Sequence, residues 1–140
     1  MEVFWGIVLT LLTLVAWVGQ VIYAISPGLG ARLGVGEATS DVDPIFYIDA
    51  RGEAICDAMI IWTLPVAGIL LILNNHTWIY FGLVGGGSYL YFVGRNVITR
   101  SMMLRQGIRI GTTFNINIGY LFLLLWGLAA IITIVMAVTA

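Results

Sequence analysis

Residues 3–25 read VFWGIVLTLLTLVAWVGQVIYAI, a stretch without a single charged side chain. About 20 apolar residues, at a rise of ~1.5 Å each, cross the hydrocarbon core of a bilayer as an α-helix. The stretch meets this length, and Gln20 is its only strongly polar residue. A cleavable signal peptide has a basic start and a short apolar core, whereas this long run follows Met1 and Glu2. We therefore expect a retained transmembrane helix.

Three further segments of the same character follow, at about residues 54–73, 78–97 and 114–138. Backbone amides in lipid must be hydrogen-bonded within the chain, so each segment is expected to be helical. A tight hairpin joins the second and third segments, and longer loops occupy residues 26–53 and 98–113. The sequence thus predicts an all-α, polytopic membrane protein: a four-helix transmembrane bundle that forms one domain over residues 1–140.

The composition predicts a surface solvated by lipid. The chain is 61% hydrophobic and 9% charged, whereas soluble domains carry about 25% charged residues. The net charge of -1 and the lack of a basic stripe argue against a nucleic-acid partner. The lipid bilayer is the expected partner, and the composition fits a multi-pass protein of a bacterial inner membrane.

The arginines predict the orientation. All six cations are Arg, and in an up-and-down bundle each falls at the face that carries loops 26–53 and 98–113. The opposite face holds both termini and the hairpin at residues 74–77, with no Arg or Lys. Because Lys and Arg concentrate on the cytoplasmic side of membrane proteins, we expect both loops to be cytoplasmic and both termini to be non-cytoplasmic.

Small residues and one proline predict how the helices pack. Helices in lipid associate through close backbone approach, which glycine permits. The third segment contains Gly82, Gly85 and Gly86, and Gly82 and Gly86 form a small-xxx-small pair. Pro65 lies near the middle of the second segment and frees the carbonyl of Ile61, so we expect a kink there.

The start of the second segment carries an unusual series of acids. Asp49, Glu53 and Asp57 are spaced four residues apart, which stacks them on one face of a helix. Ionisable groups inside a membrane are costly and need partners. Arg95 enters the third segment at a similar depth, so we expect it to pair with Asp57 or Glu53.

Polar residues from all four segments fall at the same depth and complete a candidate polar cluster. A structural salt-bridge network and a functional site are both open readings of this cluster. Its members are Asp49, Arg51, Glu53, Asp57, Arg95, Tyr91, Gln20 and Asn117.

Familiar catalytic and metal-binding patterns are missing from the sequence. The only histidine, His76, is expected at the opposite face from the acids, and no Glu-x-x-His motif of a di-iron bundle occurs. We therefore expect no metal site and no catalytic residue, and the sequence identifies no cofactor.

The layout resembles that of the small four-helix DoxX-like bacterial membrane proteins. These have one helix, a loop, and then a charged segment that opens the second helix. The residues that carry the resemblance are Ser26, Pro27, Leu33 and Gly34, followed by Asp49, Ala50, Arg51 and Gly52. The resemblance implies a fold more than an activity, although some members are associated with respiratory or redox complexes.

The sequence is compatible with three functions. The first is a non-enzymatic accessory subunit, or a bundle that self-associates as a homo-oligomer or within a larger membrane complex. The second is binding or transport of a small solute, lipid or proton through the carboxylate and arginine cluster. The third, which has the least support, is an enzyme acting on a lipid or quinone with a carboxylate as general acid or base.

Overall fold

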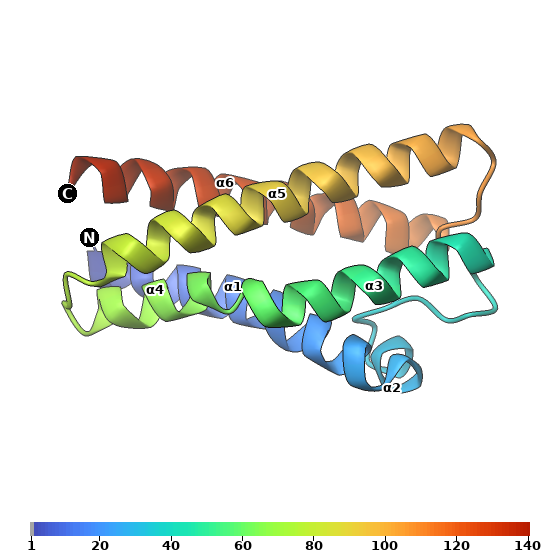
Figure 1. Cartoon of the computed structure of the whole chain (residues 1–140), viewed down its shortest axis with the longest axis horizontal. Coiled ribbons are helices and arrows are strands. Elements are labelled where there is room, and N and C mark those ends of the chain that lie inside the picture. Colours follow the sequence, from blue (N-terminus) through green and yellow to red (C-terminus); the bar gives the residue numbers. More distant parts are fainter. Residues whose placement is uncertain (1) are drawn as a thin grey trace.

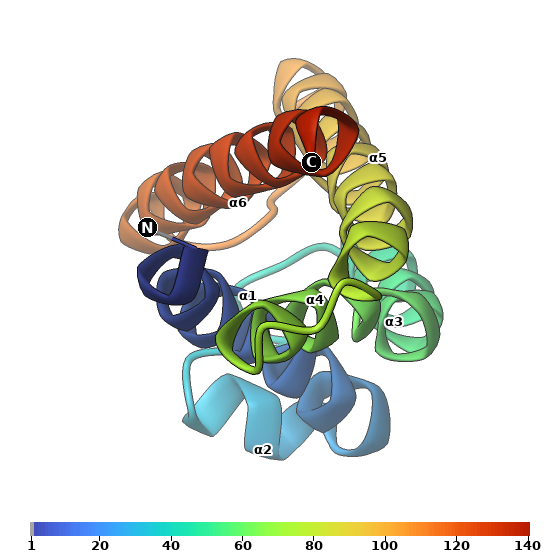
Figure 2. The ribbon, with the colours of Figure 1, turned by 90° about the vertical axis from the view of Figure 1, so that its left-hand side faces the viewer.

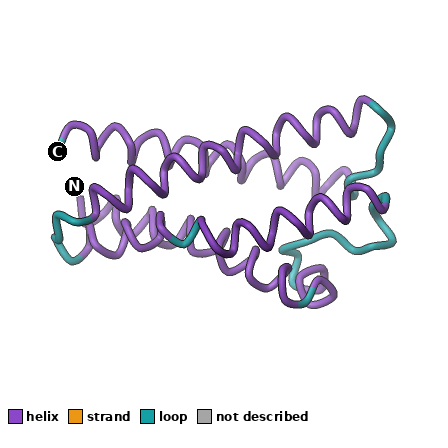
Figure 3. Tube along the Cα trace, in the orientation of Figure 1, coloured by secondary structure: helices purple, strands orange, loops and turns teal. Residues whose placement is uncertain are grey.

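Helices account for the fold of residues 2–140, the part of the chain that the computed structural model describes, and this part contains no β-strand. Helices α3 and α4 run in line, and the chain then doubles back twice through α5 and α6 (Figures 1 and 3). The helices are α1 (Glu2–Ile25), α2 (Pro27–Arg32), α3 (Pro44–Ile60), α4 (Thr63–Ile72), α5 (Trp78–Arg105) and α6 (Thr113–Thr139).

Three stretches of helix are long and apolar enough to cross a membrane: α1, the combined α3 and α4 (Pro44–Ile72), and α6. They identify the chain as a multi-pass integral membrane protein. Helix α5 is not among them, because its central glycines, its tyrosines and Arg95 lower its hydropathy. A fourth span over residues 78–97 therefore stays a prediction.

Two helices extend well beyond the segments expected from hydropathy. Helix α3 begins at Pro44 rather than near residue 54, and α5 continues to Arg105 rather than ending near residue 97. Consequently the expected loop over residues 26–53 contains α2 and the first turns of α3. Hydropathy marks only the apolar part of a helix, whereas the first turns of α3 carry Asp49 and Glu53 and the last turns of α5 carry Arg100 and Arg105.

The rod formed by α3 and α4 is interrupted at Ile61 and Trp62, one turn before Pro65, which is where the proline predicts a kink. A helix end leaves backbone carbonyls without partners, and lipid cannot satisfy them. Here side chains do so. The carbonyls of the last three residues of α3 accept hydrogen bonds from Trp17 Nε1 (2.9 Å), Trp62 Nε1 (3.0 Å) and Thr63 Oγ1 (3.1 Å).

The glycines of α5 face two different neighbours. A Cβ atom on Gly86 would lie 2.6 Å from Ile134 Cγ1 of α6, and one on Gly85 would lie 2.6 Å from the backbone nitrogen of Leu64 in α4. Gly82 also faces α6, beside Thr133. The helix therefore packs closely on both sides, because these positions lack side chains.

Figure 2 shows the helices end-on, with α5 between α6 and the broken rod, and α1 on the other side of that rod. Aromatic donors tie α1 to the helices across from it. Tyr89 donates to the carbonyl of Thr13 (2.8 Å), which joins α5 to α1. Trp126 donates to the carbonyl of Leu12 (2.9 Å), which joins α6 to α1. Apart from such links, α1 and α6 approach each other at few points.

Candidate functional site

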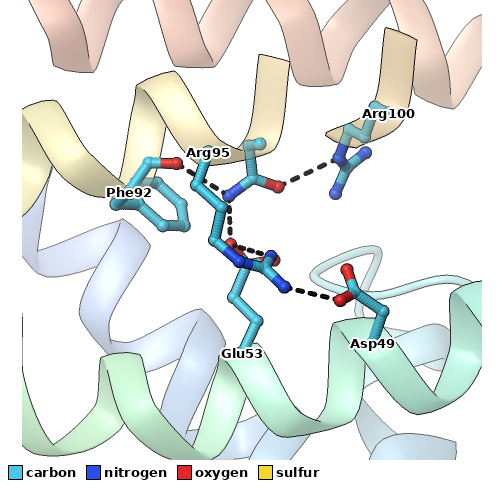
Figure 4. A network of polar contacts seen from close by, with 6 residues as sticks. Asp49, Glu53, Phe92, Arg95 and Arg100 are labelled. Carbon is cyan, nitrogen blue, oxygen red and sulfur yellow. Dashed lines mark hydrogen bonds and ion pairs between the residues drawn. The ribbon is translucent and has the colours of Figure 1, made fainter. Parts of the chain in front are cut away.

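Arg95 of α5 lies between two carboxylates of α3 (Figure 4). Its Nη2 atom is 2.5 Å from Asp49 Oδ1, and its Nη1 atom is 3.0 Å from Glu53 Oε1. The Glu53 side chain is 10% exposed and that of Arg95 is 28% exposed. The four-residue spacing of the acids places both on the face of α3 that meets α5. The pairs fix the register between these two helices.

Asn96 extends this network toward the end of α5. Its buried side-chain amide donates to the Glu53 carboxylate and to the carbonyl of Phe92 (3.0 Å). The amide oxygen accepts a hydrogen bond from Arg100 Nε (3.0 Å). Sequence reasoning missed Asn96 and Arg100, although the i, i+4 spacing of an amide and an arginine next to Arg95 is a signal that points to them.

Several expected members of the polar cluster lie outside the network. Asp57 is 9% exposed, and its Oδ2 atom has no hydrogen-bond partner within residues 2–140. Arg51 turns toward α1, where Nη2 donates to the carbonyl of Ala24 (3.2 Å). Tyr91 is 73% exposed and Asn117 is exposed, so both side chains face away from the cluster.

A pocket of about 230 Å³ lies beside the network, in the half of the molecule opposite both termini. It lies between the second half of α1 and the first half of α6, and α3 and α5 contribute further walls. Gln20, which the sequence placed in the cluster, lines this pocket. Other lining residues are Val15, Tyr23, Glu53, Arg100, Phe122 and Trp126.

The segment 34–37 covers one side of the pocket. A Cβ atom on Gly19 would lie 3.3 Å from Val35 Cβ, so this segment rests directly on α1. On the other side Glu37 accepts a hydrogen bond from Asn115 Nδ2 of α6 (2.9 Å). Glu37 was not expected in the site, because it lies in an irregular segment without periodicity and carries no sequence signal.

The connection between α2 and α3 is joined to the connection between α5 and α6. The backbone of Val42 forms an isolated antiparallel bridge with Ile110. Asp43 Oδ1 lies 3.1 Å from Arg109 Nε, and Oδ2 accepts from the Arg109 backbone N–H (2.8 Å). These bonds hold the pKa of the Asp43 carboxyl below its ordinary value of 3.8. Asp43 occupies the N-cap position of α3 but makes no side-chain cap bond there.

Nothing in the described chain assembles three or more His, Cys, Asp or Glu side chains in an arrangement that could hold a metal ion. Comparison with family models, with curated proteins and with solved structures finds no match to this chain.

Proposed function

We propose that this protein binds a small amphiphilic molecule in the pocket between α1 and α6. The observation that most directly supports this proposal is the polarity of the pocket. On α1 the lining changes from Val15 to Tyr23 toward the end of the helix, and on α6 it changes from Trp126 to Asn115. The apolar groups therefore lie toward the middle of the bundle, and the polar groups lie toward its loop end. An amphiphile aligned with the bilayer has the same polarity.

The packing around the pocket supports access from the bilayer. Ligand sites in helical bundles lie between helices. Trp126 and Leu12 join α6 to α1 at the inner end of the pocket, and the two helices make few other contacts. A volume of about 230 Å³ lies below the ~300–1,000 Å³ of pockets that enclose a drug-sized ligand. The pocket therefore fits the head and the first part of a tail, while the rest of the tail lies along the outer face of the helices.

The carboxylate and arginine network has a supporting role in this proposal. Arg95 pairs with both Asp49 and Glu53 and holds α3 against α5. Asn96 then links Glu53 to Arg100, which lines the pocket. The network thereby fixes the polar wall of the pocket.

Filling the pocket tests the proposal. Gly119 lines the pocket, and a Cβ atom there meets only Arg100 Nη1, at 3.6 Å. Gly119→Leu therefore extends into the pocket without a backbone clash. Gly94 of α5 has no neighbour within 4 Å and supplies the matched control, Gly94→Leu. Native mass spectrometry of gently extracted protein should show a bound amphiphile on wild type and on the control, and none on Gly119→Leu. Equal occupancy in all three would contradict the proposal.

We also propose that α5 crosses the membrane as a fourth span, with the loops cytoplasmic and both termini outside. The absence of Arg and Lys from the face that carries the termini supports this orientation, and the layout resembles that of the DoxX-like bacterial membrane proteins. Alkaline phosphatase fused after Ala140 should be active in bacterial cells, and green fluorescent protein fused there should be dark. The reverse pattern would contradict the orientation.

Self-association, or membership of a larger membrane complex, is a second candidate function. Gly87 of α5 has no neighbour within 4 Å, and Tyr80 and Val84 beside it are exposed. An outward glycine flanked by exposed apolar side chains favours close approach by another helix. Gly87→Leu should then reduce a dimer detected by cross-linking in membranes to monomer, and an unchanged dimer would count against this face.

A further inference from the structure

The hydroxyl of Tyr23 is a buried donor without a partner. Tyr23 is 4% exposed and lines the pocket, and its oxygen has no hydrogen-bond partner within residues 2–140. Its ring is held in place by two glycines: a Cβ atom on Gly30 would lie 2.8 Å from Tyr23 Cδ2, and one on Gly36 would overlap the ring. A buried hydroxyl without a partner costs free energy, so the fixed position of this ring calls for an acceptor that the chain does not supply.

Arg100 supplies a second set of donors at the same pocket. Its Nε atom donates to Asn96 Oδ1 (3.0 Å), and its guanidinium carbon lies 5.3 Å from the centre of the Phe46 ring. The terminal nitrogens Nη1 and Nη2 make no hydrogen bond or ion pair with any residue in 2–140. The guanidinium is therefore fixed by its neighbours while its outer donors stay available.

The charges around the pocket select a neutral partner for these donors. Arg100 is the only lining residue with positive charge, and Glu37 and Glu53 line the same pocket. Glu53 is already held by Arg95 and Asn96, and Glu37 by Asn115. An anionic head would meet two carboxylates, and a cationic head would meet Arg100. A neutral group that accepts hydrogen bonds avoids both repulsions.

We infer that the pocket recognises an amphiphile with a neutral head that carries carbonyl oxygens, which accept hydrogen bonds from Tyr23 and Arg100. This inference rests on the proposed function and names the class of its ligand. Quinone rings and the esters or amides of neutral lipids share this chemistry. The apolar body of the ligand lies against Phe122 and Trp126, farther along the pocket.

Matched probes test the head group directly. Wild-type protein in nanodiscs is titrated with methyl dodecanoate, dodecanoate and dodecyltrimethylammonium, which share a tail and differ in head charge, and with a decyl-substituted benzoquinone. We expect the ester or the quinone to bind at least tenfold more tightly than either ion. Whichever of the two neutral probes binds more tightly shows whether the head is an ester or a quinone ring, and either result supports the inference. Tighter binding of dodecanoate or of the ammonium would overturn it.

Two conservative variants locate the donors. Tyr23→Phe keeps the ring and should weaken binding of the neutral probe about fivefold, as expected for one lost hydrogen bond. Arg100→Gln should weaken binding of the same probe by roughly tenfold or more. The controls are Tyr91→Phe and Arg105→Gln, whose side chains are both exposed on α5, and these should bind as wild type does. Thermal unfolding of each variant confirms that it is folded.

The outcomes separate the inference from the function on which it depends. If the neutral probes bind wild type and Tyr23→Phe equally, the assignment of the head fails while the pocket remains a binding site. If no probe binds wild type, or if Gly119→Leu binds every probe as wild type does, the pocket is not a binding site and the proposed function fails as well.

Discussion

Arg95 on α5 pairs with Asp49 and Glu53 on α3 and leaves Asp57 without a partner. The acid that lies deepest in the apolar segment is thus the one that the arginine does not neutralise. The paired charges therefore lie toward the loop end of the bundle, where water is closest. Arg95 therefore fixes the contact between α3 and α5 at that end and leaves the middle of the bundle apolar.

Removing this arginine should destabilise the fold. Arg95→Gln leaves the Glu53 carboxylate buried without its cation, which costs about 3 kcal/mol when a buried pair loses one partner. The difference in the free energy of unfolding is measured by titrating the protein in mild detergent with a denaturing detergent. Arg105→Gln is the control, because Arg105 is exposed. Adding Glu53→Gln to the Arg95 variant should recover most of the loss, and a double variant as unstable as the single one would contradict the pairing.

Two tyrosines of α5 form a matched pair for the hydrogen bond to α1. Tyr89 is fully buried and donates to the carbonyl of Thr13, whereas Tyr91 is 73% exposed. Tyr89→Phe should lower the free energy of unfolding by about 1 kcal/mol, while Tyr91→Phe should change it by less than about 0.5 kcal/mol. Equal effects of the two substitutions would show that the hydroxyl of Tyr89 does not join the helices.

Two neighbouring glycines of α5 should respond to alanine in opposite directions. A methyl group on Gly85 would lie 2.6 Å from the Leu64 nitrogen, and one on Gly87 meets nothing within 4 Å. Gly85→Ala should destabilise by about 1–3 kcal/mol through overpacking. Gly87→Ala should stabilise by about 0.5–1 kcal/mol, because alanine favours the helix. A stable Gly85→Ala variant would contradict the close contact of α5 and α4.

Acid should loosen the contact between the two long connections. The pKa of Asp43 is lowered in the folded chain, chiefly because its carboxylate accepts a hydrogen bond from the Arg109 backbone. Because the folded pKa lies below the ordinary value of 3.8, the stability that the carboxylate adds is fully present above that value and is lost as the pH falls through the folded pKa. The protection of the Arg109 amide against hydrogen exchange, measured relative to an unstructured peptide at the same pH, should therefore fall only below about pH 4. Asp43→Asn should show fast exchange at neutral pH as well, and slow exchange in that variant would contradict the role of the carboxylate.

The sequence contained the parts of the site that follow a helical period. Asp49 and Glu53 were expected on one face, and Arg95 at their depth, because spacing and burial cost constrain both. Glu37 and the placement of Arg51 could not be predicted in this way, since each depends on how an irregular segment returns to the helices. The extension of α5 from residue 97 to Arg105 was missed because hydropathy reports only the apolar part of a helix.

The measurement that tests binding in the pocket most directly is photolabelling in nanodiscs. A neutral ester with a diazirine in its tail is activated by light, and the labelled residues are mapped by peptide mass spectrometry. The account predicts labels concentrated at the pocket, on Phe122 and Trp126 of α6 and on Val15 of α1, and their loss in Gly119→Leu. Labels spread evenly over outward residues such as Leu124 and Val138, and unchanged in Gly119→Leu, would contradict it.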